Sequence, residues 1–330
     1  MSDRTNFPNP AGRASNMGTG SQDSRLEGRS TTEVVEQAQC WWEAARAGQL
    51  SWGELAERLW TVHYQISEGH HPDGDRQRRC GFGEVIFGER KSAAAIITIA
   101  QRLLDSGQDE VLITRLDSST ASEVGRAFPD MRYLPEARMA RMGRAEVLPV
   151  RKFRSSPLAA SVFAPPPLPS PAPPREPAGA ELPLPPVAIV SGGSTDAPIT
   201  AEAAETLRWM GIDPDVIQDV GVAGPYRLIP YLPRLRQCAA VVVVAGMEGA
   251  LASVVGGQVP CPVIAVPTSV GYGAHLHGMT TLLSMLSSCA AGVTAVNIDG
   301  GFKGGYLAGL ISHQVAWRLL QVVDHHGGQT

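Results

Sequence analysis

The feature that most constrains this chain is the alternation of buried-strand patterns with glycine turns and helices, seen best between Ala239 and Gly292. The stretch opens with alanines and valines over 239–245, an apolar and β-branched run that predicts a strand buried on both faces. A glycine turn and a helix follow, then a second such strand over 261–266 and a small-residue helix over 279–290. Ligands of an open parallel sheet bind beyond the carboxyl ends of its strands, so we expect the chemistry here.

The same alternation continues on both sides of this stretch. Helices are expected between the strands, and the pattern predicts an α/β fold with a doubly wound parallel sheet and right-handed crossovers. The additional strands are predicted over residues 187–191, 215–220 and 292–298, and the additional helices over 199–210, 225–238 and 302–324.

Composition limits the class of protein. The 330 residues suggest two domains, and a hydrophobic content of 43% is sufficient for packed cores. A net charge of −4 argues against nucleic acid as the main partner. The five cysteines are scattered and have no CxxC spacing, which argues against a disulfide framework and a zinc knuckle. With no long apolar run and no signal-peptide pattern, we expect a cytoplasmic protein.

The rest of the chain divides by composition. Residues 1–29 are polar and aperiodic and are expected to be a disordered tail. Residues 30–152 predict a small α/β domain that begins with two helices, whose capping boxes start at Ser30 and Ser51. Its predicted strands are 84–87, 111–114 and 145–150, and its further helices are 91–106 and 119–128. Residues 153–186 form a proline-rich linker, a semi-rigid spacer, before the domain over 187–330.

A dense group of charges lies just before the first strand of the small domain. Three arginines over residues 76–79, with Lys91 after the strand, surround backbone glycines. Such a set suits a phosphate or carboxylate group. A solvated basic turn is the alternative interpretation.

Four successive strand ends of the large domain are rich in glycine and hydroxyl residues. Backbone N–H groups and helix dipoles at such turns can hold a phosphate or carboxylate. None of the four is a Walker loop or a GxGxxG motif, so neither an ATPase nor a nicotinamide-dependent dehydrogenase is indicated. The four turns lie at residues 191–196, 219–224, 246–250 and 267–273.

Two further groups could carry chemistry. Cys289 is expected on the small-residue helix over 279–290, where it is either a packed structural cysteine or a thiolate nucleophile. His275 and His277 form an HxH pair, but a zinc site needs a third and a fourth ligand and the sequence suggests none.

The motifs together resemble the LarB family, the first enzyme in the synthesis of the nickel-pincer nucleotide cofactor of lactate racemase. The C-terminal part is similar to PurE, the aminoimidazole ribonucleotide mutase/carboxylase, and the N-terminal pattern resembles the LarB domain that PurE lacks. The motifs that carry the resemblance are Ser-Gly-Gly-Ser-Thr-Asp (191–196), Asp-Val-Gly-Val-Ala-Gly (219–224), Val-Ala-Gly-Met-Glu-Gly-Ala-Leu (244–251), Val-Pro-Thr-Ser-Val-Gly-Tyr-Gly (266–273), Asn-Ile-Asp-Gly-Gly-Phe (297–302), Asp73-x-x-Arg76, Gly81-Phe82-x-Glu84-Val85 and Lys91.

The resemblance implies a flavodoxin-like domain that carboxylates the pyridinium ring of nicotinic acid adenine dinucleotide with CO2 or bicarbonate. It also implies cleavage of the phosphoanhydride, with Mg²⁺ as a cofactor and a homo-oligomer, usually an octamer. By motif position the resemblance implies three catalytic residues. Cys289 would be the thiolate, Glu248 the acid/base or magnesium-associated carboxylate, and Asp196 would hold the region of the ribose-phosphate and CO2. The implied substrate-binding residues are Ser191, Gly192, Ser194, Thr195, Gly221, Gly224, Arg227, Gly246, Met247, Ser269, Gly271, Asp73, Arg76, Glu84 and Lys91.

The chain departs from the family pattern at one turn. Pro225 and Tyr226 stand where the family usually has an aliphatic residue and a histidine. A phenol is a poor substitute for an imidazole in proton transfer near neutrality. Two alternatives therefore stay open at this point: a PurE-type mutase or carboxylase on aminoimidazole ribonucleotide, and a non-catalytic nucleotide-binding module.

Overall fold

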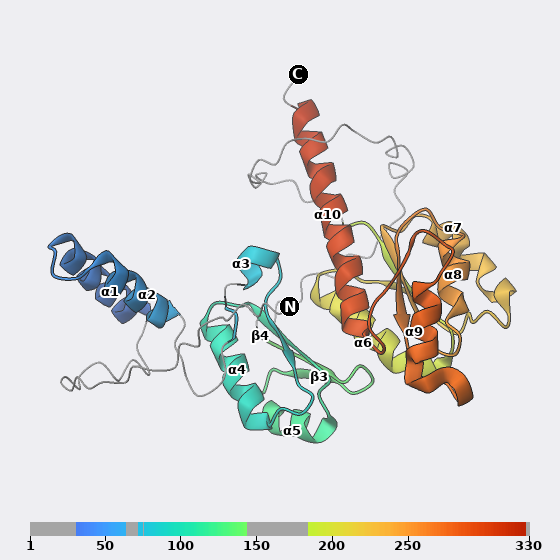
Figure 1. Cartoon of the computed structure of the whole chain (residues 1–330), viewed down its shortest axis with the longest axis horizontal. Coiled ribbons are helices and arrows are strands. Elements are labelled where there is room, and N and C mark those ends of the chain that lie inside the picture. Colours follow the sequence, from blue (N-terminus) through green and yellow to red (C-terminus); the bar gives the residue numbers. More distant parts are fainter. Residues whose placement is uncertain (1–30, 64–71, 75, 144–183, 328–330) are drawn as a thin grey trace, which may run out of the picture. The chain divides into compact units, whose positions relative to one another are not determined.

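The computed structural model describes residues 31–63, 72–74, 76–143 and 184–327, and it divides into two units, 1–71 and 72–330 (Figure 1). The predicted tail, the linker up to residue 183 and the predicted strand over 145–150 lie outside the described residues. Within those residues, no helix is both long and apolar enough to cross a bilayer.

The first unit holds helices α1 (Thr31–Arg46) and α2 (Trp52–His63). The capping box predicted for α2 is confirmed, because the Glu54 N–H donates to Ser51 Oγ at 3.2 Å and the Ser51 N–H donates to Glu54 Oε2 at 2.9 Å. Gly48 adopts a positive φ of 74° between the helices. The box at Ser30 lies outside the described residues. The contacts group both helices apart from the sheet domain, whereas the sequence placed them in one domain over 30–152.

The second unit contains a sheet of five parallel strands in the order β6-β5-β7-β8-β9. This is the flavodoxin-like order, so the predicted doubly wound α/β fold is confirmed. The strand order reverses between β5 and β7, which is where such sheets bind ligands. The strands are β5 (Val187–Ser191), β6 (Asp215–Ile217), β7 (Ala240–Ala245), β8 (Val263–Pro267) and β9 (Val293–Ala295).

Alternate residues of the central strands fill two cores. Ile189 and Val242 pack with helices α6 (Ala197–Trp209) and α10 (Gly301–Gly327) on one face. Val190 and Val243 pack on the other face, whose helices are α7 (Leu232–Leu235), α8 (Ala250–Gly256) and α9 (Met279–Leu286). Because both faces are covered, the strands are apolar throughout, as their sequence indicated. Truncating one of these side chains to alanine should cost about 2–5 kcal/mol.

A smaller sheet in the same unit has the order β1-β2-β4-β3, with β1 parallel to β2 and the other pairs antiparallel. One face of this sheet packs against α4 and α5. From the other face, Leu112 and Met139 pack against Trp209 of α6 and Phe302 of α10. Helices α6 and α10 therefore contact both sheets. The elements are α3 (Arg76–Cys80), β1 (Val85–Phe87), α4 (Ala93–Asp105), β2 (Glu110–Thr114), α5 (Ser118–Ala127), β3 (Arg132–Leu134) and β4 (Met139–Gly143).

Several predictions of secondary structure differ from the structure, including the helix over 279–290, which ends at Leu286 and leaves Cys289 in the segment after it. The helix expected over 225–238 is replaced by two 3₁₀ turns, Pro225–Arg227 and Ile229–Tyr231, followed by the short α7. Prolines 225, 230 and 233 each remove an N–H donor, so a continuous helix cannot form. The hairpin of β3 and β4 was not predicted, since β3 has only three residues.

Candidate functional site

Asp196 lies at the centre of the glycine turns, at the start of α6. Its side chain is 4% exposed, and it accepts hydrogen bonds from the Gly193 N–H at 3.0 Å and from Thr268 Oγ1 at 2.8 Å. Burial raises the pKa of the carboxyl group, the bonds from Thr268 and Gly193 lower it, and the charge of Asp299 raises it, with a net increase. Asp196 thus links the turn after β5 to the turn after β8.

Ser191 ends β5 at the strand switch point. Its hydroxyl is fully buried, and within the described residues it has no hydrogen-bond partner. A buried polar group without a partner costs about 1–3 kcal/mol, so it needs an explanation such as a ligand. Ser194 and Thr195 of the same turn are exposed, and a Cβ added to Gly192 would lie 3.3 Å from Asp196 Oδ2.

The glycine turns approach one another so closely that larger residues do not fit. A Cβ on Gly221 would lie 2.7 Å from the Gly192 carbonyl oxygen, which brings the turns after β6 and β5 into contact. A Cβ on Gly246 would lie 2.3 Å from the Val270 carbonyl oxygen, which does the same for the turns after β7 and β8. All four predicted turns therefore gather at one edge of the sheet.

Arg227 holds the turn after β6 in shape. Its guanidinium donates to the carbonyl oxygens of Asp219 at 2.7 Å, Gly221 at 3.2 Å and Gly224 at 3.4 Å. The neighbouring Tyr226 is 71% exposed. The structure thus gives Arg227 a role in supporting the turn, beside the substrate contact that the sequence indicated.

Buried polar groups fix the turn that carries Glu248. Met247 has a positive φ of 52°, and its carbonyl oxygen accepts a hydrogen bond from Thr281 Oγ1. Thr281 Oγ1 is also 2.9 Å from His275 Nε2, while His275 Nδ1 accepts from the Gly278 N–H at 3.1 Å. Since Nδ1 is the acceptor, Nε2 carries the proton and donates to Thr281. Both ring nitrogens of His275 are therefore engaged within the protein, and Glu248 is exposed beside Met247.

A second aspartate, Asp299, joins the site. It lies in the 297–302 motif, but the sequence indicated no role for it. Asp299 follows β9, and its Oδ1 accepts from the Ser269 N–H at 2.7 Å. Its own N–H donates to the Pro267 carbonyl oxygen at 2.8 Å. Together with Thr268, it fixes the turn after β8. The available signal was its position, because it is a polar residue directly after the last strand, like the four turns that were singled out. A Cβ on Gly271 of the same turn would meet the His275 ring at 2.3 Å.

The charged residues of the small domain form two separate groups. The Asp73 N–H donates to Glu84 Oε2, and Arg79 donates to the Asp73 carboxylate. Both acids thus lie together near the amino end of β1, and half-buried Arg76 opens α3 nearby in the sequence. Lys91 follows the carboxyl end of the same strand, where its N–H donates to the Gly88 carbonyl oxygen at 3.1 Å. The structure brings Asp73 and Glu84 together but does not add Lys91 to them.

Cys289 lies near the amino ends of the strands of the large sheet, whereas the glycine turns lie at their carboxyl ends. It is exposed in the segment between α9 and β9. Its neighbour Ser288 contacts Ser253 Oγ at 2.8 Å, and the Val263 N–H donates to the Gly292 carbonyl oxygen at 2.9 Å, at the amino ends of β8 and β9. The thiol is therefore not brought to the turns of its own chain.

Two family models match the two sheet domains. The LarB/PurE-like N-terminal domain matches residues 67–144, and AIR carboxylase matches residues 186–324. The uncharacterized protein MJ0165 of Methanocaldococcus jannaschii is 31% identical over 272 residues, which cover 82% of this chain and 94% of that protein. This chain belongs to the LarB family. Its C-terminal domain is PurE-like.

Other relatives of this LarB-family chain match the PurE-like domain. The N5-carboxyaminoimidazole ribonucleotide mutase of Mycobacterium tuberculosis is 32% identical over 147 residues, which cover 42% of this chain and 83% of that enzyme. A crystal structure of a PurE2 variant from Treponema denticola covers 44% of this chain and 97% of its own, with 16% identity and a TM-score of 0.30. The fold is established by the strand order and by the family match.

The acids of this LarB-family site do not form a metal cage. Among the described residues, no three His, Cys, Asp or Glu side chains are arranged to hold an ion together. Asp196 is already bonded to Gly193 and Thr268, and Glu248 is exposed. A magnesium ion usually keeps several waters and is held by one or two carboxylates together with substrate phosphates. Within the described residues the acids therefore form no cage that would hold Mg²⁺ by itself, whereas a Mg²⁺ bound together with substrate phosphates would need only one of them.

Proposed function

We propose that this LarB-family protein carboxylates the pyridinium ring of nicotinic acid adenine dinucleotide and hydrolyses its phosphoanhydride. The products are pyridinium-3,5-biscarboxylic acid mononucleotide and AMP. The observation that carries the proposal is the pairing of a LarB-type N-terminal domain with a PurE-like domain that retains Cys289 after α9. The relatives named as mutases match the PurE-like domain, over 42% of this chain.

A thiolate solves the main chemical difficulty of this reaction. The pyridinium ring is electron-poor and cannot attack CO2. When the Cys289 thiolate adds to the carbon para to nitrogen, the ring accepts the electron pair and becomes a dihydropyridine with an enamine-like neighbouring carbon. That carbon attacks CO2 and forms the new C–C bond. It then loses its proton to a base, and the thiolate leaves as the ring becomes aromatic again. Water cleaves the phosphoanhydride in a separate step and releases AMP.

The glycine turns supply groups for the rest of the substrate. Their backbone N–H groups and the start of α6 suit phosphate oxygens, and the unpartnered Ser191 hydroxyl can bond a ribose or carboxylate. The raised pKa of Asp196 suits a residue that takes the ring proton and gives it up again. Glu248, exposed on its turn, is the second acid/base candidate.

We propose that Cys289 acts in the site of a second subunit. Its thiol lies at the edge opposite the turns of its own chain, so we assign it to the site of a neighbouring copy. An apolar surface on the 273–278 turn and α9 supports assembly, because exposed patches of this kind mark protein–protein contacts. Its exposed side chains are Tyr272 at 82%, Leu276 at 66%, Met279 at 45%, Leu283 at 56% and Leu286 at 63%. Cys289 follows this surface directly, and an octamer is the assembly that we propose.

A product analysis tests the proposed reaction. The full chain is incubated with nicotinic acid adenine dinucleotide, Mg²⁺ and ¹³C-bicarbonate, and the nucleotides are analysed by mass spectrometry. We expect AMP and a mononucleotide with one labelled carboxyl group. The variant Cys289→Ser should still bind the dinucleotide but incorporate no label, because a serine hydroxyl is not ionised near neutrality. Full label incorporation by this variant would contradict the thiolate mechanism.

The PurE-type activity is the alternative that the curated relatives favour. The same preparation is therefore given N5-carboxyaminoimidazole ribonucleotide in a parallel assay. Turnover of this nucleotide, without labelling of the pyridinium product, would assign the chain to mutase chemistry. Binding of the dinucleotide with no turnover of either compound would favour a nucleotide-binding module, for which Tyr226 in place of a histidine is the main support.

A further inference from the structure

Arg115 connects the small sheet to the loop that precedes α10. It follows β2 and has a positive φ of 55°. Its Nε and Nη2 donate to the two carboxylate oxygens of Glu202 at 3.0 and 3.1 Å, and Nη2 also donates to the Asp299 carbonyl oxygen. One side chain of the small domain therefore bonds α6 and the loop after β9 at the same time.

The contacts continue from Asp299 to the candidate site. Asp299 Oδ1 accepts from the Ser269 N–H at 2.7 Å. The adjacent Thr268 hydroxyl donates to the buried Asp196 carboxylate at 2.8 Å. Thus a continuous series of polar contacts runs from Arg115 through the turn after β8 to the proposed acid/base.

Glu202 depends on this arginine. It is 3% exposed, and burial raises its pKa, while Arg115 and the backbone N–H groups of Phe302 and Gly301 lower it, leaving a net increase. A Cβ on Gly301 would lie 2.8 Å from Glu202 Oε2, so the carboxylate lies against the first residue of α10. Without the guanidinium, a buried carboxylate at this helix start would lose its cationic partner.

We propose that Arg115 is a positioning residue through which the small domain sets the geometry of the turn after β8, and with it the site around Asp196. A guanidinium is required, because its planar fork makes three bonds at once and an ammonium group cannot reproduce that geometry. The inference rests on the proposed function only for its nucleotide-binding readout; its structural readout is independent.

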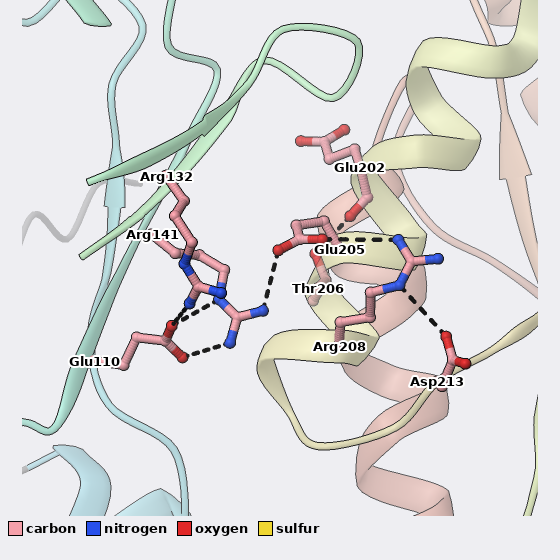
Figure 2. Close-up of polar contacts among 8 residues, drawn as sticks. All are labelled: Glu110, Arg132, Arg141, Glu202, Glu205, Thr206, Arg208 and Asp213. Carbon is pink, nitrogen blue, oxygen red and sulfur yellow. Dashed lines mark hydrogen bonds and ion pairs between the residues drawn. The ribbon is translucent and has the colours of Figure 1, made fainter. Parts of the chain in front are cut away.

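Arg141 provides a matched control from the same sheet to the same helix (Figure 2). It donates to Glu205 of α6 at 3.1 Å and to both oxygens of Glu110 at 2.8 and 2.7 Å. Its side chain is 15% exposed, against 23% for Arg115. Glu205 also forms an ion pair with Arg208 at 3.7 Å, and Arg208 forms another with Asp213. These contacts extend away from the glycine turns. Both arginines join the domains, but only Arg115 contacts the loop of Asp299.

The test compares Arg115→Lys with Arg141→Lys in the full chain. Hydrogen exchange is measured for a peptide that contains residues 268–271, and binding of nicotinic acid adenine dinucleotide is measured by titration. We expect Arg115→Lys to accelerate exchange of the Ser269 amide and to weaken binding, each about tenfold, since a hydrogen bond to a charged group is lost. Arg141→Lys should lower the melting temperature as much as Arg115→Lys does. It should leave the exchange of the Ser269 amide and the binding of the dinucleotide unchanged.

Each outcome of this comparison supports or overturns the positioning role of Arg115. Equal exchange in Arg115→Lys and wild type, or equal acceleration in both variants, would overturn the positioning role. Accelerated exchange confined to Arg115→Lys would support it even if the wild type did not bind the dinucleotide, a result that would count against the proposed function alone. If Arg115→Lys does not fold, Glu202→Gln weakens the same contact with little change of volume, and the same acceleration is expected from it.

Discussion

Asp196 combines burial with three electrostatic influences, and their balance raises the pKa of its carboxyl group. Burial raises its pKa and Asp299 raises it further, while the bonds from Thr268 and Gly193 only partly oppose this. The folded protein thus binds this proton more tightly than the unfolded chain does. Its contribution to stability is fully present below the unfolded pKa and is lost as the pH rises through the folded pKa.

The variant Asp196→Asn should separate stability from chemistry. An asparagine can still accept from Gly193 and contact Thr268, so we expect the free energy of unfolding near neutrality to change by less than about 1.5 kcal/mol. The loss of stability with rising pH should be smaller than in the wild type. Carboxylation should fall by about 100-fold or more. Urea titrations over a pH series and the labelled-product assay measure the two effects, and an unchanged rate would exclude Asp196 as the acid/base.

Thr281 gives a second residue-scale prediction. The change Thr281→Val leaves the Met247 carbonyl and His275 Nε2 without their shared partner. We expect a loss of about 1–3 kcal/mol in the free energy of unfolding, because the buried His275 nitrogen and the part-buried Met247 carbonyl both lose their partner. Thr281→Ser retains the hydroxyl and is the control. Equal stability of the valine and serine variants in chemical denaturation would show that this contact does not support the Glu248 turn.

Residue types showed which turns matter but not which side chains pair. Asp196 was assigned from the family resemblance, because it belongs to the 191–196 motif. Its partner Thr268 and the second acid Asp299 come from segments 72 and 103 residues later in the sequence. Their pairing depends on strand order, which places β8 and β9 on the same side of β5. Sequence spacing carries no information on such contacts.

At the scale of elements, close backbone contacts hold the turns together. The change Gly246→Ala places a methyl group 2.3 Å from the Val270 carbonyl oxygen, so one turn must move. We expect a loss of about 1–3 kcal/mol and weaker dinucleotide binding. Gly257→Ala, whose new Cβ would meet only Ser253 and Val254 carbonyl oxygens at 3.6 and 3.7 Å, should be neutral. Thermal melts and binding titrations of both variants measure these effects. Equal effects of Gly246→Ala and Gly257→Ala would argue against close packing of Gly246 on the Val270 carbonyl.

The regular elements followed from periodicity where both faces of the sheet are covered. The central strands are apolar throughout; β5 and β7 were placed to within one residue and β8 to within two. The region over 225–238 was predicted as a helix from its apolar positions, but three prolines outweigh that pattern. The β3–β4 hairpin was missed because Arg132 and Arg141, which belong to its ion pairs, make the segments look solvent-exposed.

At the scale of the whole molecule, the resemblance implied an oligomer but did not say which site residues each subunit supplies. Cys289 was assigned from its motif, and a single chain places it at the other edge of the sheet from Asp196. The exposed apolar surface that ends near Cys289 is what a second copy would cover. We therefore propose that one subunit supplies the turns and another supplies the thiol.

Mixed oligomers test that claim most directly. Subunits carrying Cys289→Ser and subunits carrying Asp196→Asn, each with a different affinity tag, are dissociated, reassembled together and purified through both tags. Each variant alone should be inactive in the ¹³C-bicarbonate assay, whereas the mixed oligomers should regain label incorporation, because some sites combine an intact thiol with an intact Asp196. Mixed oligomers that form but remain as inactive as the single variants would contradict a site shared between subunits.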